Sequence, residues 1–246
     1  MNNLYTNNFS IIDLYKSPSS KSEIVTQMMH GEGFRIIKKS LKWIKIKIIE
    51  DGYLGYIKKR KFISYLKPTH KISKLSANIF KNPNYQNKIG ELPYASKIKV
   101  DKIEKKFSKF QNKWIEIKNI KYLKYKNKDI FKDIKIFKNI KYKWGGKTFK
   151  GIDCSALIQV CLNFNNRLCP RDSGQQSKFF KKNINLKNIK KNDIIYWKGH
   201  VAVALSRKKL IHAYGPRKKT IIMNIAEAIK LIKRTANLEI VFVKRI

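Results

Sequence analysis

The segment YKWGGKTFKGIDCSALIQVCLNF, residues 142–164, carries the strongest structural signal in the chain. Glycines interrupt its first half and an apolar run at helical spacing fills its second half, so we expect a loop followed by a helix that begins near Cys154. A cysteine at a helix N-terminus lies beside unpaired backbone N–H groups and the positive end of the helix dipole, which favour thiolate over thiol. The same N–H groups are suited to hold the oxyanion of a tetrahedral intermediate. Cys154 is therefore a candidate nucleophile.

The other two cysteines carry no comparable signal. Cys161 follows Cys154 by two helical turns on the same face, so we expect it to fill the core, and Cys169 has no evident role. An odd number of cysteines argues against a disulfide framework, and their spacings do not fit a zinc site. We expect neither a metal nor another cofactor.

A thiol nucleophile needs a base, and two of the four histidines lie in predicted strands downstream. His200 begins the run HVAVAL, His212 lies in LIHA, and a polar SRKK turn joins the two runs. Pairing of these strands would place the two imidazoles side by side, so that His200 accepts the proton of Cys154 and His212 fixes its tautomer. The alternative is that both are core histidines. His30 and His70 lie in the N-terminal β region and are expected to be structural.

The N-terminal half has short β patterns and an internal repeat. Three pairs of segments echo one another: LYKSP (14–18) with IFKNP (79–83), GFRIIKK (33–39) with SKIKVDK (96–102), and KWIKIK (42–47) with KWIEIK (113–118). Each repeat holds several strands and no helix, which favours two tandem small barrels. We therefore expect barrels at residues 1–66 and 67–126 and a third domain at 127–246.

The third domain is expected to be of the α+β class. Residues 126–141, KNKDIFKDIKIFKNIK, place apolar side chains at helical spacing, so we expect an opening helix that Asp129 caps. The helix after Cys154 follows it. Strands are then expected at 193–197, 200–206, 209–214 and the closing EIVFVKRI, which is the order of an α+β fold.

The formal net charge is +40, from 56 Lys and Arg against 16 Asp and Glu. Such a charge suggests a polyanionic partner. However, only eight of the basic residues are Arg, the better residue for phosphate and base contacts, and the lysines are spread from end to end. We interpret the charge as compositional drift and expect no specific nucleic-acid partner, only weak, salt-sensitive association.

No run of the sequence reaches the ~20 uncharged apolar residues of a membrane helix. The N-terminal segment also lacks the basic start, apolar run and small-residue cleavage site of a signal peptide. We therefore expect no membrane partner and a cytoplasmic location.

Four segments together resemble the NlpC-type papain-like peptidases that cut bacterial cell-wall peptides: YKWGGKTFKGIDCSAL, PRDSGQQ, NDIIYWKGHVAVAL and LIHA. Two N-terminal bacterial SH3-like barrels are similar to those of the recycling members, γ-D-glutamyl-L-diamino acid peptidases. The resemblance implies a papain-like domain, with N-terminal helices packed on an antiparallel sheet, behind two SH3-like barrels. Two departures are Ala156, where the family usually has Gly, and Asn192-Asp193 in place of Gly-Asp.

The resemblance also implies roles for individual residues. Cys154 would be the nucleophile, His200 the base and His212 the orienting group. The residues implied in substrate binding are Asp153, Ser155, Asp172 and Ser173 in the pocket, Tyr142 and Trp144 in its wall, and Glu32 and Tyr53 from the first barrel, which would bind the free amine of L-Ala.

The implied activity is hydrolysis of the γ-D-Glu–diamino acid bond in short murein peptides, L-Ala-γ-D-Glu-diamino acid, during cell-wall peptide recycling. The diamino acid is either Lys or diaminopimelate. One alternative is a peptidase or amidase that acts on intact peptidoglycan, which would require export. Another is a basic module that binds nucleic acid or cell wall and whose catalytic domain is vestigial.

Overall fold

The computed structural model describes residues 4–246 and divides into two compact units, one ending at Tyr125 and the other spanning Lys126–Ile246. Each unit is described separately. None of the helices formed by the described residues is long and apolar enough to cross a membrane.

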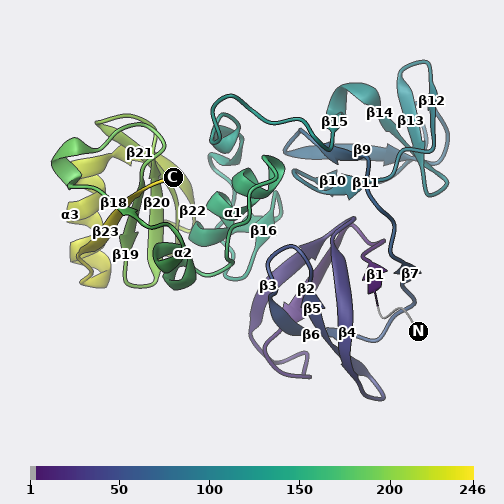
Figure 1. The fold of residues 1–246 in the computed structure, drawn as a ribbon, viewed down its shortest axis with the longest axis horizontal. Helices are drawn as coiled ribbons and strands as arrows, with labels where there is room; N and C mark the ends of the chain where they lie inside the picture. Colours follow the sequence, from purple (N-terminus) through teal and green to yellow (C-terminus); the bar gives the residue numbers. More distant parts are fainter. Residues whose placement is uncertain (1–3) are drawn as a thin grey trace. The chain divides into compact units, whose positions relative to one another are not determined.

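The first unit begins with a seven-stranded antiparallel sheet in the order β3-β2-β6-β5-β4-β1-β7 (Figure 1). Its strands are β1 (Leu4–Thr6), β2 (Ile11–Tyr15), β3 (Ile24–Met29), β4 (Gly33–Lys39), β5 (Trp43–Ile48), β6 (Leu54–Lys58) and β7 (Ile63–Ser64). The alternation in KWIKIK is confirmed, because Ile44, Ile46 and Ile48 are buried in the core of this sheet. Leu14, Phe34 and Ile57, from three other strands, belong to the same core.

The rest of the first unit is a second β structure with its own core. Its strands are β8 (His70–Ile72), β9 (Ser76–Phe80), β10 (Lys88–Pro93), β11 (Lys97–Ile98), β12 (Lys102–Glu104), β13 (Phe107–Phe110), β14 (Lys113–Glu116) and β15 (Ile120–Tyr122), with the 3₁₀ helix η1 (Ile117–Asn119) before the last strand. They form a five-stranded sheet, β10-β9-β14-β13-β12, and a three-stranded sheet, β11-β8-β15. Ile72, Leu92, Phe110 and Ile115 are among the buried residues between them.

The internal repeat is visible in the strand order, but one pair of matching segments is misaligned. The order β10-β9-β14-β13-β12 follows the order β3-β2-β6-β5-β4 strand by strand. In that alignment KWIEIK, on β14, corresponds to β6, whereas KWIKIK lies on β5. The expectation that these two segments mark equivalent strands is therefore wrong, because a Trp and Ile alternation suits any half-buried strand.

The second unit does not open with the expected helix. Residues 126–141 form turns and one short 3₁₀ helix, η2 (Ile134–Phe137). Asp129 accepts a hydrogen bond from the backbone N–H of Phe131 at 3.0 Å, as in a turn. Phe131, Ile134 and Phe137 are buried, so the apolar spacing reflects docking of this segment onto the core, and tertiary contacts override the helical period.

The remainder is an α+β domain. Its elements are β16 (Lys147–Thr148), β17 (Gly151–Ile152), α1 (Cys154–Phe164), α2 (Ser173–Phe179), β18 (Lys182–Asn183), η3 (Leu186–Asn188), β19 (Ile194–Trp197), β20 (His200–Ala204), β21 (Lys209–Tyr214), η4 (Gly215–Arg217), β22 (Lys219–Asn224), α3 (Ile225–Ala236) and β23 (Ile240–Arg245). Six strands form one antiparallel sheet, β18-β23-β19-β20-β21-β22. The predicted helix after Cys154 and the four predicted strands are confirmed, whereas α2, α3 and β22 were not predicted.

Both faces of this sheet are covered. Every residue of β20 is buried. Helix α3 packs through Ala228 and Ile232 against Ala202 and Leu210 of the sheet, and α1 contacts β20 and β21. Figure 1 shows α1 and α3 on opposite sides of the sheet. The start of α1 is thereby brought against the strands that carry the two histidines.

Candidate active site

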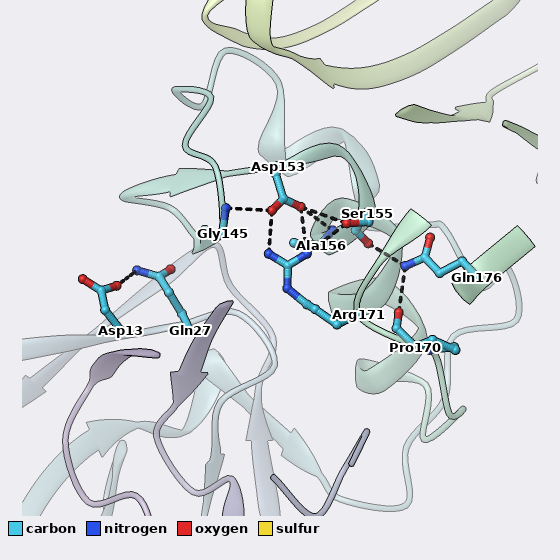
Figure 2. A network of polar contacts seen from close by, with 9 residues as sticks. All are labelled: Asp13, Gln27, Gly145, Asp153, Ser155, Ala156, Pro170, Arg171 and Gln176. Atoms are coloured by element: carbon cyan, nitrogen blue, oxygen red, sulfur yellow. Dashed lines mark hydrogen bonds and ion pairs between the residues drawn. The ribbon is translucent and has the colours of Figure 1, made fainter. Parts of the chain in front are cut away.

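Asp153 fixes the start of α1. Its Oδ1 accepts a hydrogen bond from the backbone N–H of Ala156 at 2.8 Å, so Asp153 is the N-cap of the helix. Its Oδ2 accepts from the N–H of Gly145 at 3.0 Å, which ties the glycine-rich loop to the same carboxylate (Figure 2). Cys154, the first helical residue, is held by both contacts.

A buried arginine completes this network. Arg171 donates from Nη1 to Oδ1 of Asp153 at 3.0 Å and from Nη2 to Oδ2 at 2.5 Å, and Nη1 also donates to Ser155 Oγ at 2.9 Å (Figure 2). Arg171 and Asp153 are only 2% and 5% exposed, so the charges are desolvated together. Ser155 Oγ also donates to Asp153 at 3.2 Å. Both carboxylate oxygens of Asp153 therefore already accept hydrogen bonds, and a further contact of Asp153 with substrate stays a prediction.

Gln176 supports the same helix start from α2. Its Nε2 donates to the carbonyl oxygens of Ser155 at 3.0 Å and Pro170 at 2.9 Å, so it joins α1 to the segment before α2. Neither Arg171 nor Gln176 was singled out from the sequence. The available signal was the segment PRDSGQQ, which contains both and places one of only eight arginines in a lysine-rich chain.

Cys154 is 6% exposed and lies against β20. Burial raises the pKa of its thiol to about 12, the Asp153 carboxylate adds to the rise, and hydrogen bonding to the backbone N–H groups of Val201 and Ser155 opposes it. The contact with Val201 places the thiol beside the residue that follows His200. The free site therefore holds a neutral thiol, unlike the thiolate expected at a helix start, because burial and the Asp153 carboxylate outweigh the backbone hydrogen bonds and Arg171.

The two histidines are hydrogen-bonded to each other. His200 Nε2 and His212 Nδ1 are 2.9 Å apart, which confirms that the strand pair places them side by side. The ring of Tyr214 stacks on His212, with centroids 5.0 Å apart and an interplanar angle of 9°. Burial lowers the pKa of His200 well below its ordinary value, with a smaller contribution from His212, and burial lowers the pKa of His212 to about 4. Both rings are therefore neutral at neutral pH.

The neutral state restricts the tautomers. A neutral imidazole has one donor and one acceptor, so only one of the two facing nitrogens carries the hydrogen. If His200 Nε2–H donates to His212 Nδ1, then His200 Nδ1 keeps its lone pair and is able to accept a proton. This is the tautomer that a general base requires. The arrangement is thus a thiol at a helix start and, on the strands packed against it, two imidazoles that are hydrogen-bonded to each other.

The remaining expected residues of the second unit lie in three places. Tyr142 is half-buried. Burial raises the pKa of its hydroxyl, and the nearby Cys154 and Asp153 add to the rise. Trp144 is 59% exposed in the glycine-rich loop. Asp172 is the N-cap residue of α2 and Ser173 its first residue, both partly exposed.

Glu32 and Tyr53 belong to the first unit. Glu32 lies in the turn between β3 and β4, is 2% exposed, and accepts a hydrogen bond from the N–H of Met29 at 2.6 Å. It is therefore not a solvated turn residue. Tyr53 follows β5 and packs partly on the barrel core.

A cysteine at a helix start, packed on an antiparallel sheet that carries paired histidines, is the arrangement of a papain-like cysteine peptidase. Comparison with known families agrees. Residues 139–235 match the NlpC/P60 family, and residues 14–62 match the bacterial dipeptidyl-peptidase SH3 domain. The chain therefore carries an NlpC/P60 peptidase domain and an SH3 domain of the bacterial dipeptidyl-peptidase type.

Individual relatives agree with this assignment. The gamma-D-glutamyl-L-lysine dipeptidyl-peptidase of Bacillus subtilis is 25% identical over 84% of this chain and 77% of its own length. The dipeptidyl-peptidase 6 of Lysinibacillus sphaericus is 36% identical, over 29% of this chain and 27% of that protein. A solved NlpC/P60 family protein from Bacillus cereus superposes with a TM-score of 0.83 at 17% identity, over 98% of this chain and 99% of that one, and shows the fold.

Proposed function

We propose that this protein is a cysteine peptidase that hydrolyses the γ-D-Glu–diamino acid bond of short murein peptides with a free N-terminal L-Ala. The observation that carries the proposal is the buried Cys154 with the hydrogen-bonded pair His200 and His212. The name of the Bacillus subtilis relative, gamma-D-glutamyl-L-lysine dipeptidyl-peptidase, supports the substrate class.

The chemistry follows from the neutral thiol and imidazole. His200 Nδ1 takes the proton of Cys154 as the sulfur attacks the γ-carbonyl of D-Glu, so the ion pair forms only in the reacting complex. Backbone N–H groups at the start of α1 stabilise the oxyanion. His200 then protonates the leaving amine, and water releases L-Ala-D-Glu from the acyl-enzyme.

Recognition of the free amine is assigned to the first barrel. An ammonium that leaves water requires a carboxylate partner. Glu32 is a buried carboxylate that accepts a hydrogen bond from the backbone N–H of Met29 in its own turn. Tyr53 would contribute its hydroxyl. Only peptides with an exposed L-Ala amine would then be cut, which is the property expected of an enzyme that recycles released peptides.

We also propose that residues 67–126 are a second SH3-like barrel. The strand order of its five-stranded sheet follows that of the first barrel, and a 3₁₀ helix precedes its last strand. The family match at residues 14–62 supports this assignment for the first barrel.

The test is incubation with L-Ala-γ-D-Glu-diaminopimelate and its N-acetylated form, with products identified by mass spectrometry. Release of L-Ala-D-Glu from the free peptide alone supports both the Cys-His-His chemistry and the amine pocket. Equal cleavage of both peptides contradicts the amine pocket. Cleavage of neither by folded protein contradicts the peptidase activity and favours a binding role.

Glu32→Gln keeps the shape of the side chain and removes its charge. We expect kcat/KM for the free tripeptide to fall by the equivalent of ~1–3 kcal/mol, the usual cost of losing a charged hydrogen-bond partner. The matched control is Glu23→Gln, a carboxylate of the same barrel in an exposed ion pair with Lys16 at 3.5 Å. Unchanged kinetics of Glu32→Gln would remove Glu32 from the proposed site.

A further inference from the structure

One lysine of the second β structure contacts the turn that carries Glu32 from both sides. We propose that Lys97, on β11, is a positioning residue that holds Glu32 in the geometry needed for the substrate amine. This inference rests on the proposed role of Glu32 as the amine-binding carboxylate. It gives the second barrel a part in substrate selection.

The backbone of Lys97 binds the residue before the turn glycine. The N–H of Lys97 donates to the carbonyl of His30 at 2.8 Å, and His30 Nδ1 lies 2.9 Å from the carbonyl oxygen of Lys97. Burial lowers the pKa of His30 to about 4, so the ring is neutral and Nδ1 carries the hydrogen that it donates. His30 is 1% exposed and packs edge-on against Phe110, with centroids 5.7 Å apart. His30 is thus fixed on both sides by the second β structure.

Gly31 permits the close approach of the two chains. Its φ is +79°, and a Cβ at this position would lie 2.0 Å from the carbonyl oxygen of Lys97. Any other residue would have to displace backbone as well as adopt an unfavourable φ. The absence of a side chain at Gly31, directly before Glu32, therefore permits the contact with Lys97.

The side chain of Lys97 reaches the other side of the same turn. Its Nζ forms an ion pair with Glu50 Oε1 at 2.8 Å, and the same oxygen accepts the N–H of Gly33 at 3.2 Å. The two side chains are 20% and 17% exposed. Burial lowers the pKa of Lys97, but the Glu50 and Glu32 carboxylates outweigh it and leave the pKa above its ordinary value. Residues on both sides of Glu32 are thus held through one lysine.

Glu32 itself has little freedom once its turn is held. Its carboxylate accepts the N–H of Met29 at 2.6 Å, and its carbonyl accepts the N–H of Asn7 at 3.0 Å. Loss of the Lys97 ion pair removes the contact that holds Glu50 against Gly33, and the carboxylate is then less precisely placed for an ammonium. Because binding groups must lie within about 0.5 Å of their working geometry, amine recognition weakens while the chemistry at Cys154 does not.

The experiment measures kcat and KM for the free tripeptide with Lys97→Met, Lys97→Arg and Lys102→Met. Lys102 is a matched control because it forms an exposed ion pair with Glu104, at 3.1 Å, in the same β structure. We expect Lys97→Met to raise KM about fivefold or more with little change in kcat, Lys97→Arg to recover most of the loss, and Lys102→Met to resemble the wild type. A merely structural role would reduce the active fraction and hence kcat, with KM unchanged, and would overturn the inference.

A double variant separates this inference from the proposed function. If Lys97 acts through Glu32, then Lys97→Met in the Glu32→Gln background has no further effect on KM, and additive effects overturn the inference. If the wild type cuts free and N-acetylated peptides equally, it is the amine pocket that fails. If Lys97→Met does not fold, Glu50→Gln breaks the same ion pair and leaves the Lys97 backbone contacts in place. We expect it to raise KM in the same direction, and an unchanged KM would count against Lys97.

Discussion

At the scale of single residues, the proposed nucleophile and the two histidines are held in their neutral forms. Cys154 is buried with a raised pKa, and the pKa values of His200 and His212 are lowered by burial. We therefore expect the thiolate–imidazolium pair of the proposed mechanism to form only when substrate is present. The charged groups beside the thiol act in opposite directions, since Asp153 raises the pKa of Cys154 and Arg171 lowers it.

Cys154→Ala should abolish turnover, because it removes the proposed nucleophile, and it should leave the fold intact. Turnover is followed by mass spectrometry and folding by thermal denaturation. Cys161→Ala is the control, since Cys161 lies on the same helix and is fully buried. It should keep activity and lose stability by ~1 kcal/mol or more, as expected for removal of a buried side-chain atom. Activity near wild type in Cys154→Ala would contradict the mechanism.

The pH profile follows from the lowered pKa of His200. The base works only when it is neutral, and a lowered pKa keeps it neutral as pH falls through the ordinary histidine value of 6.5. We therefore expect kcat/KM to stay level from pH 7 through pH 6 and to decline only at lower pH. A decline centred at pH 6.5 would show that His200 is solvated and not buried as described.

At the scale of elements, the start of α1 is positioned by an ion pair from outside the helix. Helix α1 itself is predictable from its apolar period, and Asn192 adopts the left-handed φ of +73° that its substitution for Gly requires. Arg171 enters the helix start from the segment before α2, and this contact has no period in the sequence. Residues 126–141 show the converse, because their apolar residues recur at helical spacing but form no α-helix.

Arg171→Met should lower the free energy of unfolding of the second unit by ~3–5 kcal/mol, because it leaves the buried Asp153 carboxylate without its charge partner. The matched control is Arg245→Met. Arg245 also forms a two-bond pair with an aspartate, Asp193, at 2.8 Å, but its side chain is 29% exposed. Asp193 is also buried, but water can enter the space that the partly exposed Arg245 leaves, so the loss of Arg245 should cost less. Denaturant unfolding compares the two, and equal losses would contradict a special role for Arg171.

At the scale of the whole molecule, the charge of +40 is spread over both units and no site described here requires it. Among the described residues, Lys97 is partly buried beside Glu50, whereas lysines such as Lys16 and Lys118 pair with carboxylates from exposed positions. The interpretation of the remainder as compositional stays a prediction.

Association with duplex DNA should therefore be weak, independent of sequence and lost with salt. Between about 50 and 200 mM salt we expect the affinity to fall by more than about tenfold, because binding depends on release of counterions. Fluorescence anisotropy with two unrelated duplexes measures this. Tight, sequence-selective binding that survives 200 mM salt would overturn the compositional interpretation and assign the charge a function.

The local signals in the sequence were sufficient for the helix at Cys154, the strands of His200 and His212, the β-rich first half and the candidate nucleophile and base. These depend on residue type, period and turn chemistry, which act over a few neighbouring positions. The neutral state of the thiol, the Arg171–Asp153 pair and the Lys97 contacts with the Glu32 turn were decided by tertiary structure alone. The contacts join residues that are distant in sequence. Their energies, and the protonation state of the thiol, depend on burial, which no single segment specifies.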